Sequence, residues 1–383
     1  MSAAACDNMP QGSRKNLRYN FLIKYPPGSR NMNASQQFPI LRSTLRVAIV
    51  GALAVAPLLT VDSAHARAAC GCTLSTDWDT QGNTTKSGFT ADISYSSVNQ
   101  NQQRYGTGSA SPTLINNQLA AGQEVEAFTK TQTVTAALIY NDETWGVTAQ
   151  IPYVDRTHGT YGQTAPLGSS YSSSYDSGIG DIKVLGRYTG YSETGASGII
   201  AGLKLPTGST AANFNAGTSV GQPLDAGLQI GTGSTDVILG GYTSSTIASY
   251  GWFAQGTVQH AIATKQALGN LDYRPGDSYS LNSGIRYAGF GAKISPMLQL
   301  NIIKRQADSG AVNAAGLGSV PIDPITGAPV SGGTLAYLAP GASMRLGGGA
   351  SAYGFIQLPL YQNVSSLQLT PRYTYTLGVR QSF

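Results

Sequence analysis

The sequence predicts an all-β protein, a transmembrane antiparallel up-and-down β-barrel of about twelve strands. Charged residues make up only 11% of the 383 residues, yet mean hydropathy is −0.10, so the chain is neither an average soluble protein nor rich in apolar helices. Segments of about ten residues alternate apolar with polar side chains, and the gaps between them alternate long with short. All three features are typical of barrels whose strands face lipid on one side and a polar lumen on the other.

The last segment shows the alternation most clearly. Its odd positions hold Tyr373, Tyr375, Leu377, Val379 and Phe383, and its even positions hold Arg372, Thr374, Thr376, Gly378, Arg380 and Ser382. A spacing of two places the apolar set on one face of a strand, whereas a helix would need a spacing of three and four.

Eleven further strands are expected from the same pattern. They span residues 88–97, 131–140, 145–154, 180–190, 197–205, 234–243, 251–259, 278–287, 294–303, 335–346 and 350–361. Their apolar rows, such as Phe89, Ala91, Ile93 and Tyr95, often end in an aromatic residue, as interface girdles do.

The gaps between these segments give the orientation. Long gaps are expected at 98–130, 155–179, 206–233, 260–277 and 304–334, and short ones at 141–144, 191–196, 244–250, 288–293 and 347–349. The gap 362–370 is intermediate and falls where a long one is due. Outer-membrane barrels have an even strand number, long outer loops and short periplasmic turns, so both termini should be periplasmic. A soluble β-sandwich has no reason to alternate its gaps in this way.

Residues 1–68 are expected to be a leader with a secretory signal. Val47–Leu59 is an uncharged apolar run preceded by Arg42 and Arg46, and Ala64-His65-Ala66 is a small-residue cleavage pattern. We therefore expect the mature chain to begin between Arg67 and Cys70. Whether the true start is Met1 or Met32 stays open, because residues 1–31 do not fit a normal signal.

The basic excess of the chain belongs to this leader. Residues 1–68 hold eight Lys and Arg against two Asp and Glu, whereas residues 69–383 hold 16 against 17. No basic patch suited to nucleic acid is found, so we expect no nucleic-acid partner.

Residues 69–87 are expected to be a periplasmic segment that precedes the barrel, residues 88–383. The segment holds Cys70 and Cys72, which are interpreted as a local disulfide or free thiols. A metal would need two more ligands, for which only His158 and His260 were candidates, so neither metal nor cofactor is expected.

Catalysis and nucleotide binding find little support. His158 and His260 lie at strand ends entering long loops, with no recognisable serine partner, so we expect no enzyme. Gly178-Ile-Gly180 and Gly231-Thr-Gly233 lack the third glycine and the helix of a dinucleotide loop.

The charged residues of the polar rows are the candidate site. If the apolar rows face lipid, these ten line the lumen: Asp92, Asp181, Lys183, Arg187, Lys204, Asp236, Arg286, Arg305, Arg372 and Arg380. Seven are cations, which favours a weakly anion-selective channel. The alternative is a structural or adhesive barrel whose lumen charges pair and pack it shut, since a twelve-stranded barrel is compatible with either.

Two resemblances add to this interpretation. Tyr375, Leu377, Val379 and Phe383 resemble the C-terminal signal read by the barrel-assembly machinery, although Gln381 departs from it. Four stretches resemble the "meta-pathway of phenol degradation" family of outer-membrane transporters: WGVTAQIPYVDR (145–156), GIGDIKVLGRY (178–188), GLKLPTG (202–208) and GTGSTDVILGGY (231–242). The resemblance implies passive uptake of a small aromatic or hydrophobic molecule through the bacterial outer membrane, with membrane lipid and the assembly machinery as partners.

Overall fold

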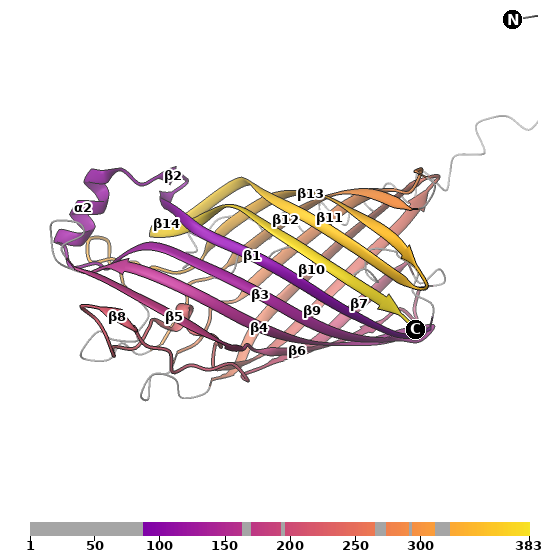
Figure 1. Ribbon diagram of the computed structural model, residues 1–383, viewed down its shortest axis with the longest axis horizontal. Coiled ribbons are helices and arrows are strands. Elements are labelled where there is room, and N and C mark those ends of the chain that lie inside the picture. The colour runs from indigo at the N-terminus through magenta and orange to yellow at the C-terminus, as the bar shows by residue number, and fades with distance from the viewer. Residues whose placement is uncertain (1–86, 163–169, 193–195, 265–272, 291–292, 311–321) are drawn as a thin grey trace, which may run out of the picture. The chain divides into compact units, whose positions relative to one another are not determined.

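The computed structural model describes residues 87–162, 170–192, 196–264, 273–290, 293–310 and 322–383, which form a closed antiparallel β-barrel (Figure 1). Each long strand pairs with the preceding and following long strand, and the last strand returns to pair with the first. The predicted leader and Cys70 and Cys72 lie outside the described residues. Among the described residues, no helix is long and apolar enough to cross a membrane.

The wall is built from strands that are mostly longer than expected. They are β1 (Gly88–Gly106), β3 (Val125–Asn141), β4 (Trp145–Tyr161), β5 (Tyr171–Ile179), β6 (Ile182–Tyr188), β7 (Ser197–Leu205), β9 (Ser234–Ile247), β10 (Tyr250–Thr264), β11 (Ser278–Tyr287), β12 (Ile294–Arg305), β13 (Gly333–Gly347) and β14 (Ala350–Ser382). Short elements lie in the loops: β2 (Gly108–Ser109), β8 (Ala216–Gly217), helix α2 (Pro112–Ala120) and a 3-10 turn η2 (Ala226–Leu228).

The predicted number of about twelve membrane-crossing segments is confirmed. Both β5 and β6 pair with β4 and form one crossing, interrupted at Gly180 and Asp181. Strand β14 supplies two crossings, because residues 350–364 pair with β13 and residues 364–382 pair with β1. In the described part of the chain, the barrel therefore has eleven strands if β14 is counted once and twelve if its two legs are counted.

The fold-back of β14 corrects one prediction. A loop was expected at 362–370, but pairing continues on both legs almost to Ser366, whose φ of +44° marks a tight turn. The cause is the apolar tip of this hairpin: Leu367 packs with Leu119 and Val125 in a buried cluster. Burial of the tip makes a hairpin stable where a loop was expected.

The remaining connections alternate as predicted. Short turns at 142–144, 189–196, 248–249, 288–293 and 348–349 lie at one end of the barrel. Gly88 and Phe383 share that end, since the Phe383 N–H donates to the Phe89 carbonyl at 2.9 Å and the Ser382 N–H to the Gly349 carbonyl at 3.1 Å. The longer loops lie at the other end, here called the long-loop end.

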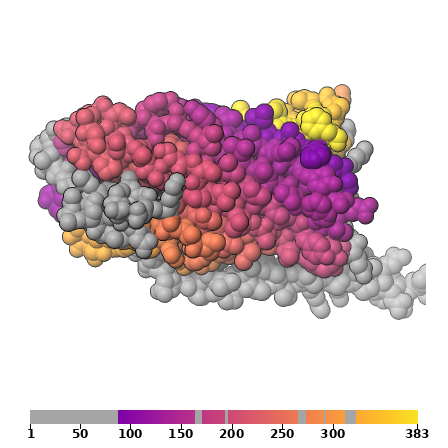
Figure 2. Space-filling view, turned by 90° about the horizontal axis from the view of Figure 1, so that it is seen from below, coloured from indigo at the N-terminus to yellow at the C-terminus, as the bar shows by residue number. Residues whose placement is uncertain are grey.

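The two faces of the wall differ as the alternation predicts. Apolar side chains such as Phe89, Ile93, Ile151, Ile199 and Leu203 are exposed on the outer face, while the residues between them are mostly buried or half-buried. The outer wall forms a continuous surface on the face seen in Figure 2. In water this surface would be costly, and in a bilayer it is matched by lipid.

Candidate functional site

The barrel interior is the candidate site, because it collects most of the charged residues predicted to line the lumen. Eight of the ten lie on the inward rows of their strands: Asp92, Lys183, Arg187, Lys204, Asp236, Arg286, Arg305 and Arg380. A ninth, Asp181, sits at the interruption between β5 and β6. That these residues line a pore remains a prediction.

Arg372 departs from its predicted place. Val98 pairs with Thr374 and Gln100 pairs with Pro371, so one residue of β1, Asn99, faces two residues of β14, Arg372 and Tyr373. This is a β-bulge, in which plain alternation fails. Arg372, Tyr373 and Asn99 are exposed whereas Pro371 and Thr374 are buried, so the prediction that Arg372 points inward is wrong.

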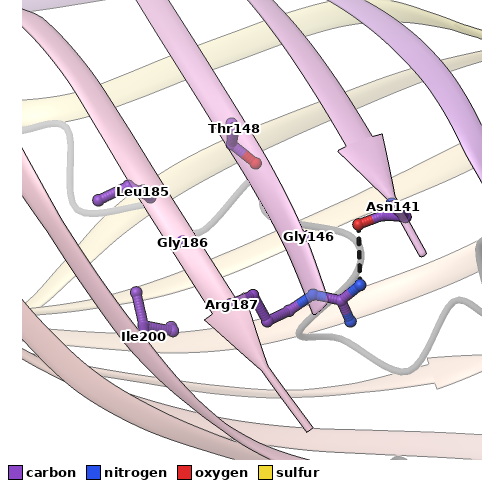
Figure 3. A pocket seen from close by; sticks show the side chains of 7 residues that line it. All are labelled: Asn141, Gly146, Thr148, Leu185, Gly186, Arg187 and Ile200. Atoms are coloured by element: carbon purple, nitrogen blue, oxygen red, sulfur yellow. Dashed lines mark hydrogen bonds between the residues drawn. The ribbon is translucent and has the colours of Figure 1, made fainter. Parts of the chain in front are cut away.

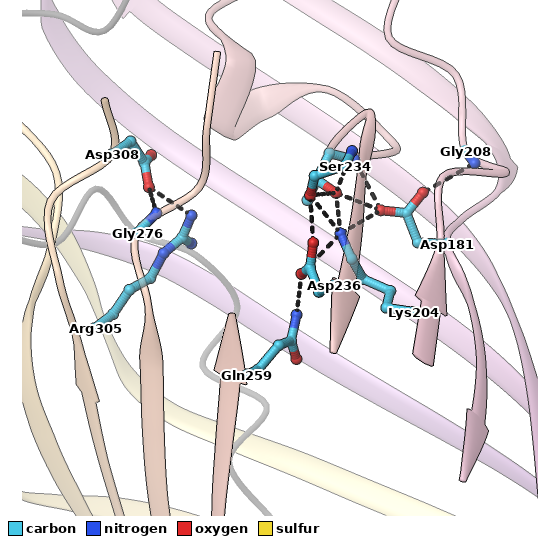
Figure 4. A network of polar contacts seen from close by, with 10 residues as sticks. Asp181, Lys204, Gly208, Ser234, Asp236, Gln259, Gly276, Arg305 and Asp308 are labelled. Atoms are coloured by element: carbon cyan, nitrogen blue, oxygen red, sulfur yellow. Dashed lines mark hydrogen bonds and ion pairs between the residues drawn. The ribbon is translucent and has the colours of Figure 1, made fainter. Parts of the chain in front are cut away.

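The densest polar cluster is centred on Lys204 at the end of β7 (Figure 4). Its ammonium lies 3.2 Å from an Asp181 oxygen and 3.1 Å from an Asp236 oxygen, and it donates to the Ser234 hydroxyl at 3.0 Å. Lys204 is only 3% exposed. Two of the predicted lumen acids thus share one cation, and both of their side chains are buried.

Asp181 also closes the neck of the segment 206–233. Its carboxylate accepts the Gly208 N–H at 3.0 Å and the Thr232 N–H at 2.9 Å, which lie at opposite ends of the segment. The two chain segments of the neck cross in close contact, because a Cβ on Gly208 would lie 2.5 Å from the Gly231 Cα. The neck therefore requires glycine at the crossing and depends on the Asp181 carboxylate.

The segment between the two ends of the neck is folded against the inner wall. Phe214 packs against the inward His158, with ring centroids 6.1 Å apart, and Arg156 donates to the Gln229 carbonyl at 2.8 Å. Ala212, Phe214, Leu224 and Leu228 form a cluster of their own. An inward-folded segment of this kind narrows the passage at the long-loop end.

A second charged pair lies nearer the short-turn end. Asp92 and Arg380 are direct cross-strand partners, and both are nearly buried. The Tyr353 hydroxyl donates to Asp92 at 3.0 Å. The Tyr353 ring lies over Gly378, where an added Cβ would come within 2.2 Å of the ring.

Two arginines lie against the inner wall close to the short-turn end. Arg187 lies over Gly146 and borders a pocket of about 10 Å³ (Figure 3). It donates to Asn141 Oδ1 at 2.8 Å and to the Tyr242 hydroxyl at 3.2 Å. Arg286 lies in the same way over Gly251. Both are half-buried, and among the described residues no carboxylate lies within ion-pair distance of either. These two cations are the strongest candidates for contact with a solute.

The middle of the inner wall between β11 and β14 is closely packed. Asn282 donates to Asn301 at 3.2 Å, Asn301 to Gln357 at 3.3 Å and Gln357 to Thr374 at 2.9 Å, and the first three amides are nearly inaccessible. Tyr337 at the same side is 0% exposed. This side of the interior is filled rather than open.

Two aspartates organise the loops of the long-loop end. Asp308 accepts from Arg305 at 2.8 Å and from the Gly276 N–H at 2.8 Å (Figure 4). It also accepts from the Tyr273 hydroxyl at 3.0 Å. Burial, together with the Asp308 carboxylate, raises the pKa of Tyr273, so the hydroxyl remains a donor.

Asp323 joins three separate segments. It accepts from Gln118 of α2 at 3.2 Å, from Ser366 of the β14 turn at 2.6 Å and from the Ile325 N–H at 2.8 Å. Burial raises the pKa of this carboxyl, but the hydrogen bonds outweigh it and hold the pKa below its ordinary value.

The histidines and one arginine were not foreseen correctly. His158 was expected to be a loop residue, but β4 extends to Tyr161 and buries its ring on the inner wall, where Nδ1 meets the Thr129 hydroxyl at 2.9 Å. His260 lies on the outer face, 2.6 Å from Asp277. The same extension of β4 brings Arg156 into the interior, which the sequence analysis missed because the apolar alternation ends at Val154.

Comparison with known proteins shows the fold. No protein-family profile and no curated relative matches the sequence. The COG4313 outer membrane channel from Pseudomonas putida F1 superposes with a TM-score of 0.52 at 14% identity, over 79% of this chain and 98% of that one.

Two further solved structures match less closely. The Ralstonia pickettii toluene transporter TbuX superposes with a TM-score of 0.40 at 11% identity, over 78% of this chain and 90% of that one. A mutant of the TodX monoaromatic hydrocarbon channel has a TM-score of 0.40 at 7% identity, over 78% and 91%. At these values the first match establishes that the chain has the fold of an outer-membrane β-barrel.

Proposed function

We propose that this chain is a bacterial outer-membrane channel for the passive uptake of a small molecule, with both termini of the chain and the short turns in the periplasm. The observation that carries the proposal is a closed barrel with apolar outer rows and an inner wall that bears charge. A closed barrel is the form in which strands can cross a bilayer without an unpaired edge.

The charge of the inner wall supports a weak preference for anions. Asp92 faces Arg380, Asp181 and Asp236 share Lys204, and Arg187 and Arg286 have no carboxylate partner among the described residues. A low-dielectric wall lined by one sign of charge raises the local concentration of the opposite ion.

The class of solute rests on the family resemblance of the motifs in residues 145–242, which implies an aromatic or hydrophobic compound. Inward aromatic residues such as Phe253, Tyr353 and Phe355 are compatible with it, although all three are buried by their neighbours. Passage along them would require these neighbours to move.

A structural barrel with a plugged lumen is the second candidate. It is favoured by the closely packed side of the interior, where Asn301 and Tyr337 are 0% exposed. In that case the long loops would carry the function and the lumen charges would only stabilise the wall.

Single-channel conductance of the refolded chain in a planar bilayer tests the proposal. The neck offers a precise variant: the Gly231 N–H donates to the Ser209 carbonyl at 2.8 Å, so residues 210–230 can be excised and the ends rejoined with one glycine. We expect the wild type to conduct and the excised variant to conduct more, because the inward segment narrows the passage.

The double variant Arg187→Gln/Arg286→Gln tests selectivity. Under a salt gradient we expect its reversal potential to move toward cations, whereas the control Lys130→Gln/Lys304→Gln on the outer face, with the same change in charge, should not move it. Heat-modifiable mobility on a gel verifies folding of each variant. Absence of conductance in both the wild type and the excised variant would favour the plugged barrel.

A further inference from the structure

A row of polar residues crosses the outer face of three neighbouring strands near the long-loop end. The bulge turns Arg372 and Tyr373 of β14 outward, opposite Asn99 of β1, and Asn99 pairs with Lys130 of β3. Direct cross-strand partners lie on the same face of a sheet, so all four side chains share the outer surface. Arg372, Asn99 and Lys130 are all exposed.

The row lies at the border of the apolar belt that faces the long-loop end. Moving toward the short-turn end, the outer positions of β14 are Tyr375, Leu377 and Val379, and Tyr95 of β1 packs against Tyr375 with ring centroids 5.9 Å apart. Gln132 of β3 donates to the Tyr95 hydroxyl. Tyrosines at the edge of an apolar belt mark the depth of lipid headgroups, so Arg372 and Lys130 lie at the depth of the headgroups.

Neither of the two cations has an acidic partner in the part of the chain that the structure describes. Among the described residues, no carboxylate lies within 4.0 Å of Arg372 or Lys130. Asp155, the cross-strand partner of Gln132, is an acid on this face, and its carboxylate accepts from the Tyr175 hydroxyl at 2.9 Å. The row therefore carries two cations that are available to an anion.

Their spacing suits one anionic group. Two strand spacings separate β14 from β3, which places the backbones of Arg372 and Lys130 about 10 Å apart. The long side chains of arginine and lysine can both reach a group that lies between them, above Asn99. Arginine binds phosphate through two parallel N–H donors, and lysine binds it as a point charge.

We propose that Arg372 and Lys130, with Tyr373 and Asn99 between them, bind a phosphate group of the phosphorylated glycolipid of the outer leaflet. The proposal rests on the proposed membrane placement with the long-loop end outward, but not on the barrel being an open channel. The tyrosines below the row would lie against the sugar and the start of the acyl chains.

Native mass spectrometry of the full chain in detergent, titrated with bisphosphorylated lipid A, tests this site. We expect Arg372→Gln/Lys130→Gln to bind at least about tenfold more weakly than the wild type, because two charge-assisted contacts are lost. The control Lys293→Gln/Lys304→Gln changes the net charge equally and should retain wild-type affinity. Arg372→Lys should bind with intermediate affinity, since the charge remains but the paired donors do not.

Two comparison lipids identify the ligand. The wild type and the variant should bind lipid A without its two phosphates with the same affinity. Phosphatidylglycerol should bind the wild type less tightly than lipid A does. Equal loss in the control variant, undiminished binding of the dephosphorylated lipid, or a preference for phosphatidylglycerol would each overturn the proposal. Conductance of the same variants separates this result from the proposed function, because we expect it to equal that of the wild type.

Discussion

Replacing Lys204 by methionine should destabilise the barrel more than any other loss of a single charge. The ammonium is buried and contacts Asp181 at 3.2 Å and Asp236 at 3.1 Å, so its removal leaves two carboxylates in the interior without a counter-charge. Removal of one partner of a buried ion pair costs roughly 3–5 kcal/mol.

The remaining hydrogen bonds place the expected loss near the lower end of that range. Asp181 keeps the N–H groups of Gly208 and Thr232, and Asp236 keeps the Ser234 hydroxyl, which donates at 2.6 Å. Donors of this kind stabilise a charged acceptor by about 1.5–3 kcal/mol each. We therefore expect Lys204→Met to lower the free energy of unfolding by about 3 kcal/mol.

Urea unfolding in lipid vesicles, extrapolated linearly to zero denaturant, measures the effect. In Lys204→Met/Asp181→Asn/Asp236→Asn the buried charges are absent, so at least half of the lost stability should return. Lys304→Met on the outer face serves as the control and should change stability by less than about 1 kcal/mol. The reasoning fails if the triple variant is no more stable than Lys204→Met.

Three further outcomes are expected. Leu203→Arg on the lipid face should cost about 2–4 kcal/mol if it lies near the midplane, and the inward Thr257→Arg should cost less, as read by heat-modifiable mobility. Gly378→Ala should cost about 1–3 kcal/mol, because its Cβ would lie 2.2 Å from a tyrosine ring; Gly256→Ala, where the nearest atom is 3.9 Å away, should cost less than 1 kcal/mol by the same principle. Because the pKa of Asp323 lies below its ordinary value of 3.8, the charged carboxylate stabilises the long-loop end above pH 3.8, and this contribution is lost as pH falls through the lowered pKa. Limited proteolysis of the loops should therefore increase below pH 3.8, and Asp323→Asn should weaken this dependence on pH.

The membrane-facing part of the fold could be predicted because lipid imposes a strict rule. Most outward residues of the belt are apolar, so rows such as Phe89 to Tyr95 repeat with a period of two. Beyond the belt, β1, β3 and β4 continue with mostly polar residues on both faces, and the pattern that marks a strand disappears. The extra length of these strands, and with it Arg156 and His158, therefore escaped prediction.

The interior was predicted as a set of residues but not as an arrangement. Alternation places Asp181, Lys204 and Asp236 on the inner side without indicating that they meet, because their contact depends on the register of β6, β7 and β9. The bulge at Arg372 adds one residue and turns its side chain outward, and nothing in the local sequence marks it. A side chain over a cross-strand glycine, as in Tyr353 over Gly378, is also a matter of register.

The pairing of the interior charges predicts an asymmetric channel. Asp92 is matched by Arg380 and Arg305 by Asp308, whereas Arg187 and Arg286 each lie one residue from a strand end at the short turns.

Screening at these two arginines depends on the salt at their own end, since the Debye length is about 8 Å at 0.15 M and about 30 Å at 0.01 M. Lowering the salt on the short-turn side alone should therefore strengthen anion preference more than lowering it on the long-loop side alone. The measurement is the reversal potential of channels inserted in one known orientation, and Arg187→Gln/Arg286→Gln should abolish the difference between the two sides. An equal response from both sides, or a larger one from the long-loop side, would show that the selectivity is set elsewhere in the barrel.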